Sequence, residues 1–260
     1  MNWLEALILG IVQGLTEFLP VSSSGHLELG KVLLGVDAER SLIFTVVVHG
    51  ATVLSTIVIF YKDIWALIKG IFQFKWNEET QYAAKIIISM IPVVILGLFY
   101  AEEIQGFFTG NMDFVGSMLI VTSLLLAFTY FSKSNKRPVG FLDSLIIGTM
   151  QALAVLPGIS RSGSTIAGGI LLGNKKETIA KFSFLMVLIP IIGANVKDLM
   201  DGNLSQDSNI SPLVLLIGFV AAFISGALAC KWMINIVKKG KLIYFSVYCF
   251  IVGLVAILFL

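Results

Sequence analysis

Charged residues are scarce in this sequence. Only 13% of its 260 residues are Asp, Glu, Lys or Arg, and 57% are hydrophobic, whereas soluble domains have about 25% charged and about 45–50% apolar residues. Long hydrophobic runs recur along the whole chain and leave no stretch that could form a separate aqueous domain. The sequence therefore predicts one integral membrane domain that comprises residues 1–260.

Cysteine and excess charge are also rare. The two cysteines, Cys230 and Cys249, lie in separate hydrophobic runs and have no metal-ligand spacing. The formal net charge is only +2 and its carriers are scattered, so we expect no nucleic-acid partner. The first ten residues carry Glu5 and no basic leader, from which we expect no cleaved signal peptide.

Two kinds of hydrophobic segment alternate along the chain. Two short ones, 3–19 and 141–156, each end in a polar cluster, PVSSSGH at 20–26 and PGISRSGST at 157–165, and a second short apolar piece follows. Exposed to lipid, such a break would leave unpaired backbone groups at several kcal/mol each, so both segments are predicted to be re-entrant helix pairs. Six longer runs are predicted to be transmembrane helices: 42–60, 84–100, 112–131, 182–196, 212–230 and 242–260. The predicted fold class is an all-α integral membrane protein.

The distribution of basic residues predicts the orientation. With six crossings and two re-entrant pairs, 14 of the 18 basic residues fall on one side of the membrane, in segments 61–85, 132–140, 174–181 and 231–241. The other side holds Lys31, Arg40 and Lys197, and Arg161 sits in the second polar cluster. Because Lys and Arg collect on the cytoplasmic side, we expect both termini in the periplasm.

An internal repeat relates the two halves. Shifting the sequence by 138 residues aligns Gly10 with Gly148, Gln13 with Gln151, and the LLG at 33–35 with the LLG at 171–173. We infer repeat 1 at about 1–131 and repeat 2 at about 139–260, in inverted topology, which places binding sites near the bilayer midplane. The alternative is chance agreement among abundant Leu and Gly.

A few polar residues at membrane depth are candidates for function. A charged residue at the centre of a span costs about 2.5–3.5 kcal/mol, so Glu17 and Arg161 are functional candidates, and Gln13 shares a helical face with Glu17. Glu17 could hold a divalent cation or act as a base. The alternative is a structural ion pair between Glu17 and Arg161.

The second polar cluster is typical of an anion site. Gly158 and Gly163 would let the backbone approach a ligand, helix-opening amides would face it, and Arg161 offers a planar fork for phosphate oxygens. The alternative is a helix N-cap made by Ser160 or Ser162, which explains the serines but not the arginine.

The first polar cluster supplies hydroxyls and an imidazole. Such groups can serve as a nucleophile and a proton-transfer partner. His49, which lies within a predicted span, is interpreted as a satisfied core group. No Walker loop, HExxH, CxxC or GxGxxG arrangement offers a competing site.

Three stretches carry a family resemblance: QGLTEFLPVSSSGH at 13–26, SMIPVVILG at 89–97 and LPGISRSGST at 156–165. At these residues the chain resembles the undecaprenyl-diphosphatase (bacitracin-resistance) family of bacterial inner membranes, over essentially its whole length. The resemblance implies hydrolysis of undecaprenyl diphosphate to undecaprenyl phosphate and inorganic phosphate, which recycles the lipid carrier for cell-wall synthesis. It also implies a site open to the periplasm, dependence on Mg²⁺ or Ca²⁺, and a homodimer.

The resemblance also implies roles for single residues. Glu17 would assist the metal or proton transfer, Ser23 would be a nucleophile or bind phosphate, and Arg161 would grip the diphosphate. His26 would be an acid/base or the attacking group. Gln13 stands where many relatives carry Glu, so a metal would meet one carboxylate, from Glu17, and at most an amide oxygen from Gln13. The expected substrate-binding set is Gln13, Ser22, Ser24, Gly25, Gly158, Ser160, Ser162 and Gly163.

A membrane transporter or flippase for an anionic or polyprenyl-phosphate substrate is the alternative function, because inverted repeats with broken helices are common in transporters. Phosphate release in detergent distinguishes the two, since transport needs two compartments.

Overall fold

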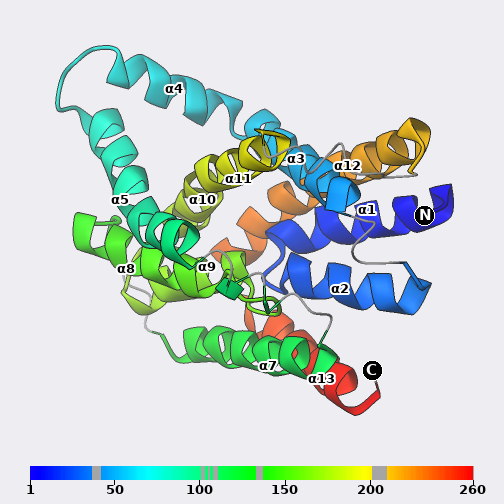
Figure 1. The fold of residues 1–260 in the computed structure, drawn as a ribbon. Coiled ribbons are helices and arrows are strands. Elements are labelled where there is room, and N and C mark those ends of the chain that lie inside the picture. The colour runs from blue at the N-terminus through cyan, green and yellow to red at the C-terminus, as the bar shows by residue number, and fades with distance from the viewer. Residues whose placement is uncertain are drawn as a thin grey trace.

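The computed structural model describes residues 1–36, 42–100, 103–104, 106–107, 111–132, 137–200 and 210–259, and the side chains of 198–200 are outside this description. Over these residues the chain is helical (Figure 1), with one isolated bridge between Arg137 and Asn174. In chain order the elements are α1 (Trp3–Phe18), α2 (Ser23–Leu34), α3 (Leu42–Ile59), α4 (Tyr61–Ile71), α5 (Glu78–Phe99), α7 (Met112–Phe128), the 3-10 helix η2 (Thr129–Phe131), α8 (Phe141–Leu153), α9 (Arg161–Leu171), α10 (Lys176–Met186), α11 (Leu188–Met200), α12 (Pro212–Lys238) and α13 (Ile243–Phe259).

Five helical segments in the described part of the chain are long and apolar enough to cross a membrane: Leu42–Ile59, Glu78–Phe99, Met112–Phe131, Lys176–Lys197 and Pro212–Lys238. To within one residue they cover five of the six predicted runs, which confirms an all-helical protein with helices that are long and apolar enough to cross a membrane. The sixth run corresponds to α13, an apolar helix of 17 residues. Its predicted last residue, 260, and the basic residues Arg40, Lys133 and Lys136 used for the topology lie outside the described residues.

The observed helices differ in detail from the predicted runs. The α5 helix begins at Glu78, earlier than expected, because Asn77 caps it by accepting a hydrogen bond from the Thr80 amide. The predicted run 182–196 is divided between α10 and α11. The α4 helix was not predicted; it exposes Trp65 beside Lys69, whose ammonium lies over the indole ring, as is typical of helices at a membrane interface.

The packing of helices crosses between the two halves of the chain. The α1 helix packs mainly on α12, α8 packs mainly on α5, and α7 packs on α13. Glycines make these approaches close: a Cβ atom on Gly10 would lie 2.5 Å from the Gly218 carbonyl oxygen, and one on Gly148 would lie 2.2 Å from the Ser89 carbonyl oxygen. Both termini lie at the right of Figure 1, opposite the connection between α4 and α5.

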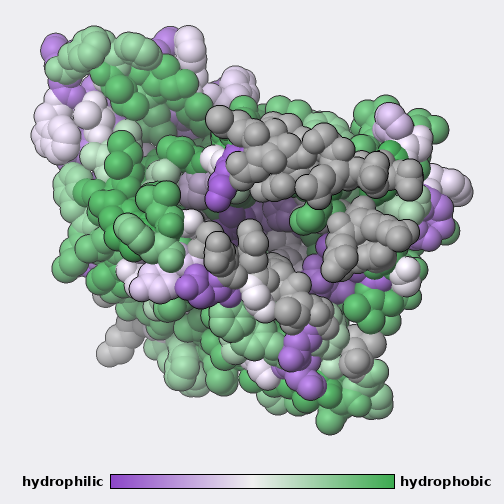
Figure 2. Space-filling model, viewed as in Figure 1, coloured by the Kyte–Doolittle hydropathy of each residue, from purple (hydrophilic) through white to green (hydrophobic). Residues whose placement is uncertain are grey.

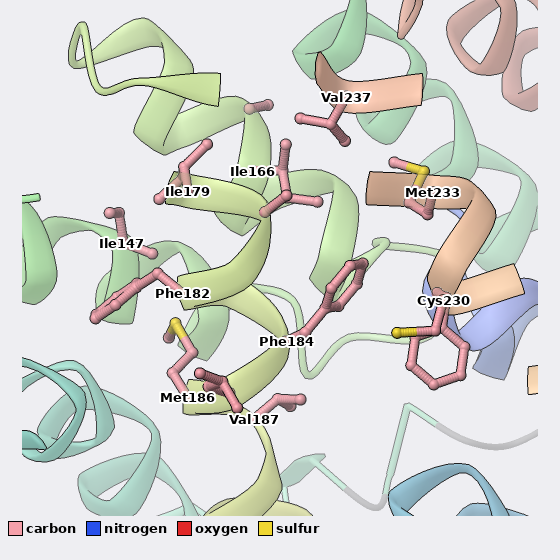
Figure 3. Packing of buried hydrophobic residues seen from close by; sticks show 14 of the residues in the cluster. Ile147, Ile166, Ile179, Phe182, Phe184, Met186, Val187, Cys230, Met233 and Val237 are labelled. Carbon is pink, nitrogen blue, oxygen red and sulfur yellow. The ribbon is translucent and has the colours of Figure 1, made fainter. Parts of the chain in front are cut away.

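The hydrophobic core lies where α8, α9, α10 and α12 meet. Ile147, Ile166, Phe182 and Met233 are fully buried there (Figure 3). Many large hydrophobic side chains instead face outward, and Figure 2 shows a surface that is green over wide areas, with hydrophilic residues both near its centre and at its edges. Outward hydrophobic residues suit a protein whose solvent is lipid. The core therefore holds α8, α9, α10 and α12 together.

Candidate active site

An ion pair joins the two polar breaks. Glu17 lies in the last turn of α1, and Arg161 is the first residue of α9. Although the residues are 144 positions apart, Arg161 Nη2 donates a hydrogen bond to Glu17 Oε1. The structure thus brings the predicted acid and guanidinium together, in the contact that a structural ion pair would also make.

The second oxygen of the Glu17 carboxylate accepts two further hydrogen bonds. Gln13 Nε2 donates to Oε2 at 2.9 Å, from one turn earlier in α1. Ser23 Oγ, at the start of α2, donates to the same atom at 2.7 Å. Because the serine proton already points at a carboxylate, Glu17 can accept that proton when the oxygen attacks an electrophile. A structural ion pair does not require this serine.

A cavity of about 180 Å³ opens beside this cluster. Its polar lining is Ser23, Ser24, His49, Gln151 and Arg161, and its apolar lining includes Val155. The Arg161 side chain is 26% exposed, whereas the Glu17 side chain is 5% exposed. The guanidinium and the Ser23 hydroxyl therefore face the cavity with the carboxylate behind them, which suits an anion that enters from the cavity.

Two helix N-termini border the site. Ser22 caps α2 and accepts from the Gly25 amide at 3.3 Å, and Ser160 caps α9 and accepts from the Gly163 amide at 3.0 Å. The positive ends of both helix dipoles thus lie near Ser23 and Arg161. The N-cap that we offered as the alternative interpretation of Ser160 is present. Ser22 has a φ of 70°, a strained value for a residue with a side chain.

The remaining serines and glycines of the predicted set mainly contact protein. Ser162 Oγ donates to the Leu19 carbonyl oxygen at 3.1 Å. Gly158 has a φ of 97°, and a Cβ atom there would lie 2.4 Å from the Val115 carbonyl oxygen. A Cβ atom on Gly25 would lie 3.2 Å from Gly158 Cα, so the two breaks touch at these glycines. One on Gly163 would meet the Ser160 side chain at 3.0 Å. Their binding of substrate stays a prediction.

His26 contacts groups away from the carboxylate cluster. Its Nδ1 lies 2.9 Å from the Ser22 carbonyl oxygen, which can only accept, so Nδ1 carries the proton and donates. Its Nε2 then accepts from Tyr248 Oη at 2.9 Å, and the two rings stack. These contacts connect α2 with α13. The predicted acid/base or nucleophilic role of His26 stays a prediction.

His49, which we interpreted from the sequence as a satisfied core group, also lies at the site. Its Nδ1 donates to the Thr45 carbonyl oxygen at 2.8 Å, as expected of a core histidine. Its Nε2, however, lies 4.0 Å from Glu17 Oε2, and the ring lines the cavity. The proximity of His49 to Glu17 results from the packing of α3 beside α1. It could not be predicted from the sequence, because a lone histidine in an apolar run does not indicate which residue it contacts.

The site fits a divalent cation only in part. Among the described residues no group of three or more His, Cys, Asp or Glu could hold a metal ion. Gln13 Oε1 is buried without a hydrogen-bond partner in the described structure, and the Glu17 carboxylate is adjacent. The Gln13 amide oxygen and the Glu17 carboxylate suit Mg²⁺, which is commonly held by one or two carboxylates, substrate phosphates and water.

Comparison with known proteins identifies the family of this chain. The family model described as bacitracin resistance protein BacA matches residues 6–255. The chain is 55% identical to the undecaprenyl-diphosphatase of Parabacteroides distasonis over 99% of this chain and 98% of the relative. It is 54% identical to the undecaprenyl-diphosphatase of Christiangramia forsetii, over 100% and 98%, and 38% identical to that of Alkaliphilus metalliredigens, over 100% and 99%. The chain therefore belongs to the bacitracin resistance protein BacA family.

Proposed function

We propose that this protein hydrolyses undecaprenyl diphosphate to undecaprenyl phosphate and inorganic phosphate. The observation that carries this function is the Glu17 carboxylate, which accepts hydrogen bonds from both Arg161 and Ser23 beside a cavity of mixed polarity. The relatives named undecaprenyl-diphosphatase support the same activity. In the cell this activity returns the lipid carrier to cell-wall synthesis and confers bacitracin resistance.

Binding of the diphosphate relies on positive charge. The Arg161 guanidinium has five N–H donors, so it can bind phosphate oxygens while it keeps its contact with Glu17. The N-termini of α2 and α9 add the positive ends of their dipoles. Phosphoryl transfer depends chiefly on such positioning and charge stabilisation.

Ser23 is the nucleophile in the mechanism that we favour. As Ser23 Oγ attacks the terminal phosphorus, its proton passes to Glu17 Oε2, and the bond to the bridging oxygen breaks. Undecaprenyl phosphate leaves, and water then attacks the phosphoserine, which releases inorganic phosphate and restores the serine. A divalent cation held by Glu17 and Gln13 Oε1 would neutralise charge on the diphosphate when bound. Direct attack by His26 or by water is the alternative.

The membrane arrangement that we propose has six transmembrane helices and two re-entrant pairs, α1–α2 and α8–α9, in an inverted repeat. Each re-entrant pair packs on a helix of the other half of the chain, α1 on α12 and α8 on α5, which supports this arrangement. The close contact of α7 with α13 also supports it, because a Cβ atom on Gly116 or on Gly253 would lie 2.7 Å from the carbonyl oxygen of the other residue. Basic segments on one side support periplasmic termini and a site facing the periplasm of a bacterial inner membrane. From the family resemblance we also infer that the protein forms a homodimer.

Phosphate release by the purified protein in detergent tests this function. We expect inorganic phosphate and undecaprenyl phosphate in equal amounts from undecaprenyl diphosphate. A transporter or flippase would release none, because it makes no chemical change. Absence of phosphate release from a folded sample, with Mg²⁺ and with Ca²⁺, would rule the phosphatase out.

A further inference from the structure

Gln151 is buried without a use in the mechanism described so far. It lies near the end of α8 and is 2% exposed. Neither its Nε2 nor its Oε1 has a hydrogen-bond partner in the described part of the chain. Leaving a buried polar group unpaired is destabilising, so such a side chain calls for a ligand or an ordered water.

Gln151 borders the site, with its amide atoms buried. Gln151 lines the same cavity as Ser23, Ser24 and Arg161. The α8 helix that carries it packs on α9, which begins at Arg161. A phosphate group held by Arg161 would therefore lie in the cavity that Gln151 also lines.

In repeat 1 the residue that corresponds to Gln151 has an anionic hydrogen-bond partner, which Gln151 lacks among the described residues. Gln13 is the counterpart of Gln151, and its Nε2 donates to the carboxylate of Glu17, one turn later in α1. The counterpart of Glu17 in repeat 2 is Val155, which also lines the cavity. Among the described residues, the amide in repeat 2 thus has no anion as its partner, and the side chain that carries it lines the cavity.

We propose that Gln151 binds the diphosphate of the substrate, with its Nε2 donating to a phosphate oxygen in the role that the Glu17 carboxylate has beside Gln13. The inference rests on the proposed function, since it takes a diphosphate as the occupant. The Oε1 atom accepts a hydrogen bond from a water that accompanies the head group.

The test replaces Gln151 by Leu, which is similar in size but cannot hydrogen bond. A hydrogen bond to a charged group contributes enough that its loss should raise KM about 10- to 100-fold, with a smaller change in kcat. The melting temperature should stay the same or rise, because an unpaired buried amide is removed. Gln81→Leu, on α5 and outside the cavity, should change neither KM nor kcat.

Direct binding separates this inference from the proposed function. Farnesyl methylenediphosphonate has a P–C–P bridge that cannot be hydrolysed, and its affinity can be measured even if no phosphate is ever released. We expect Q151L to weaken this binding by the same factor as KM. Unchanged affinity, or a lower melting temperature with unchanged KM, would overturn the role of Gln151. Absence of phosphate release by the wild type would overturn the proposed function instead.

Discussion

The Ser23 hydroxyl donates its hydrogen bond to Glu17 Oε2 at 2.7 Å, across the break between α1 and α2. The proton acceptor is therefore in place before a substrate binds. The same carboxylate neutralises Arg161, so its charge also sets how strongly the guanidinium can attract a phosphate. Substitution of Glu17 can separate its role as proton acceptor from its effect on the charge of Arg161.

Glu17→Gln keeps the shape of the side chain and removes its negative charge and its proton affinity. We expect kcat to fall about 100- to 10,000-fold, the range for a lost general base. Without added divalent cation, substrate affinity should be retained or improved, because Arg161 is no longer neutralised. Phosphate release and binding of a non-hydrolysable diphosphate measure the two effects. A kcat within a few-fold of wild type would show that Glu17 is not the base.

Ser23→Ala removes the proposed nucleophile. After acid quenching of a reaction with substrate labelled at the terminal phosphorus, we expect labelled phosphoserine at position 23 in the wild type and none in S23A. Label on His26 would instead identify the histidine as the attacking group. Wild-type kcat in S23A would be incompatible with attack by serine.

Tyr248→Phe removes the donor to His26 Nε2 and retains the stacked ring. If His26 mainly connects α2 with α13, Y248F should lower stability by about 1 kcal/mol, the typical contribution of one hydrogen bond. His26→Ala should lower it by more, because it also removes the hydrogen bond to Ser22 and the stacked ring. Their effects should be less than additive in the double variant. Melting temperatures in detergent provide the measurement. Additive losses would show that the two side chains act independently.

Gly148→Ala tests the close approach of α8 to α5. The added Cβ atom would lie 2.2 Å from the Ser89 carbonyl oxygen, and backbone cannot move aside as a side chain can. We expect a loss of about 1–3 kcal/mol, as for other overpacked positions. Gly193→Ala on α11 is the matched control, because in the described part of the chain no atom outside its own helical turn lies within 4 Å of its Cβ position. Equal melting temperatures for the two variants would contradict the packing.

Single cysteines test the proposed orientation. Cys230 and Cys249 are buried and should not react. In intact cells with a permeable outer membrane, a membrane-impermeant maleimide should label Asn2→Cys in the periplasm. It should label Lys75→Cys, in the basic segment, only after the inner membrane is opened. The reverse pattern would invert the topology.

The sequence was informative where the signal is local. Proline and serine after a short apolar segment predicted both breaks, and α1 ends at Phe18 while α9 begins at Arg161. The cost of a charge at membrane depth indicated Glu17 and Arg161, which the structure pairs. These inferences need only neighbouring residues and the properties of lipid.

Contacts between distant segments could not be predicted in this way. His26 reaches Tyr248 and His49 reaches Glu17 only because α13 and α3 pack where they do. Asn77, which caps α5, and the amphipathic α4 helix carried local signals that were missed, because the hydrophobic runs dominated the interpretation. Gln151 was found as a repeat partner, but its lack of a hydrogen bond is visible only in three dimensions.

Phosphate release by Arg161 variants tests the central claim most directly. Arg161→Ala should abolish turnover of undecaprenyl diphosphate, and Arg161→Lys, which keeps the charge but loses the planar fork, should retain only a small fraction. Both variants are compared with the wild type in the same detergent, with folding verified by their melting curves. Substantial phosphate release by folded R161A would contradict a site in which this guanidinium holds the diphosphate.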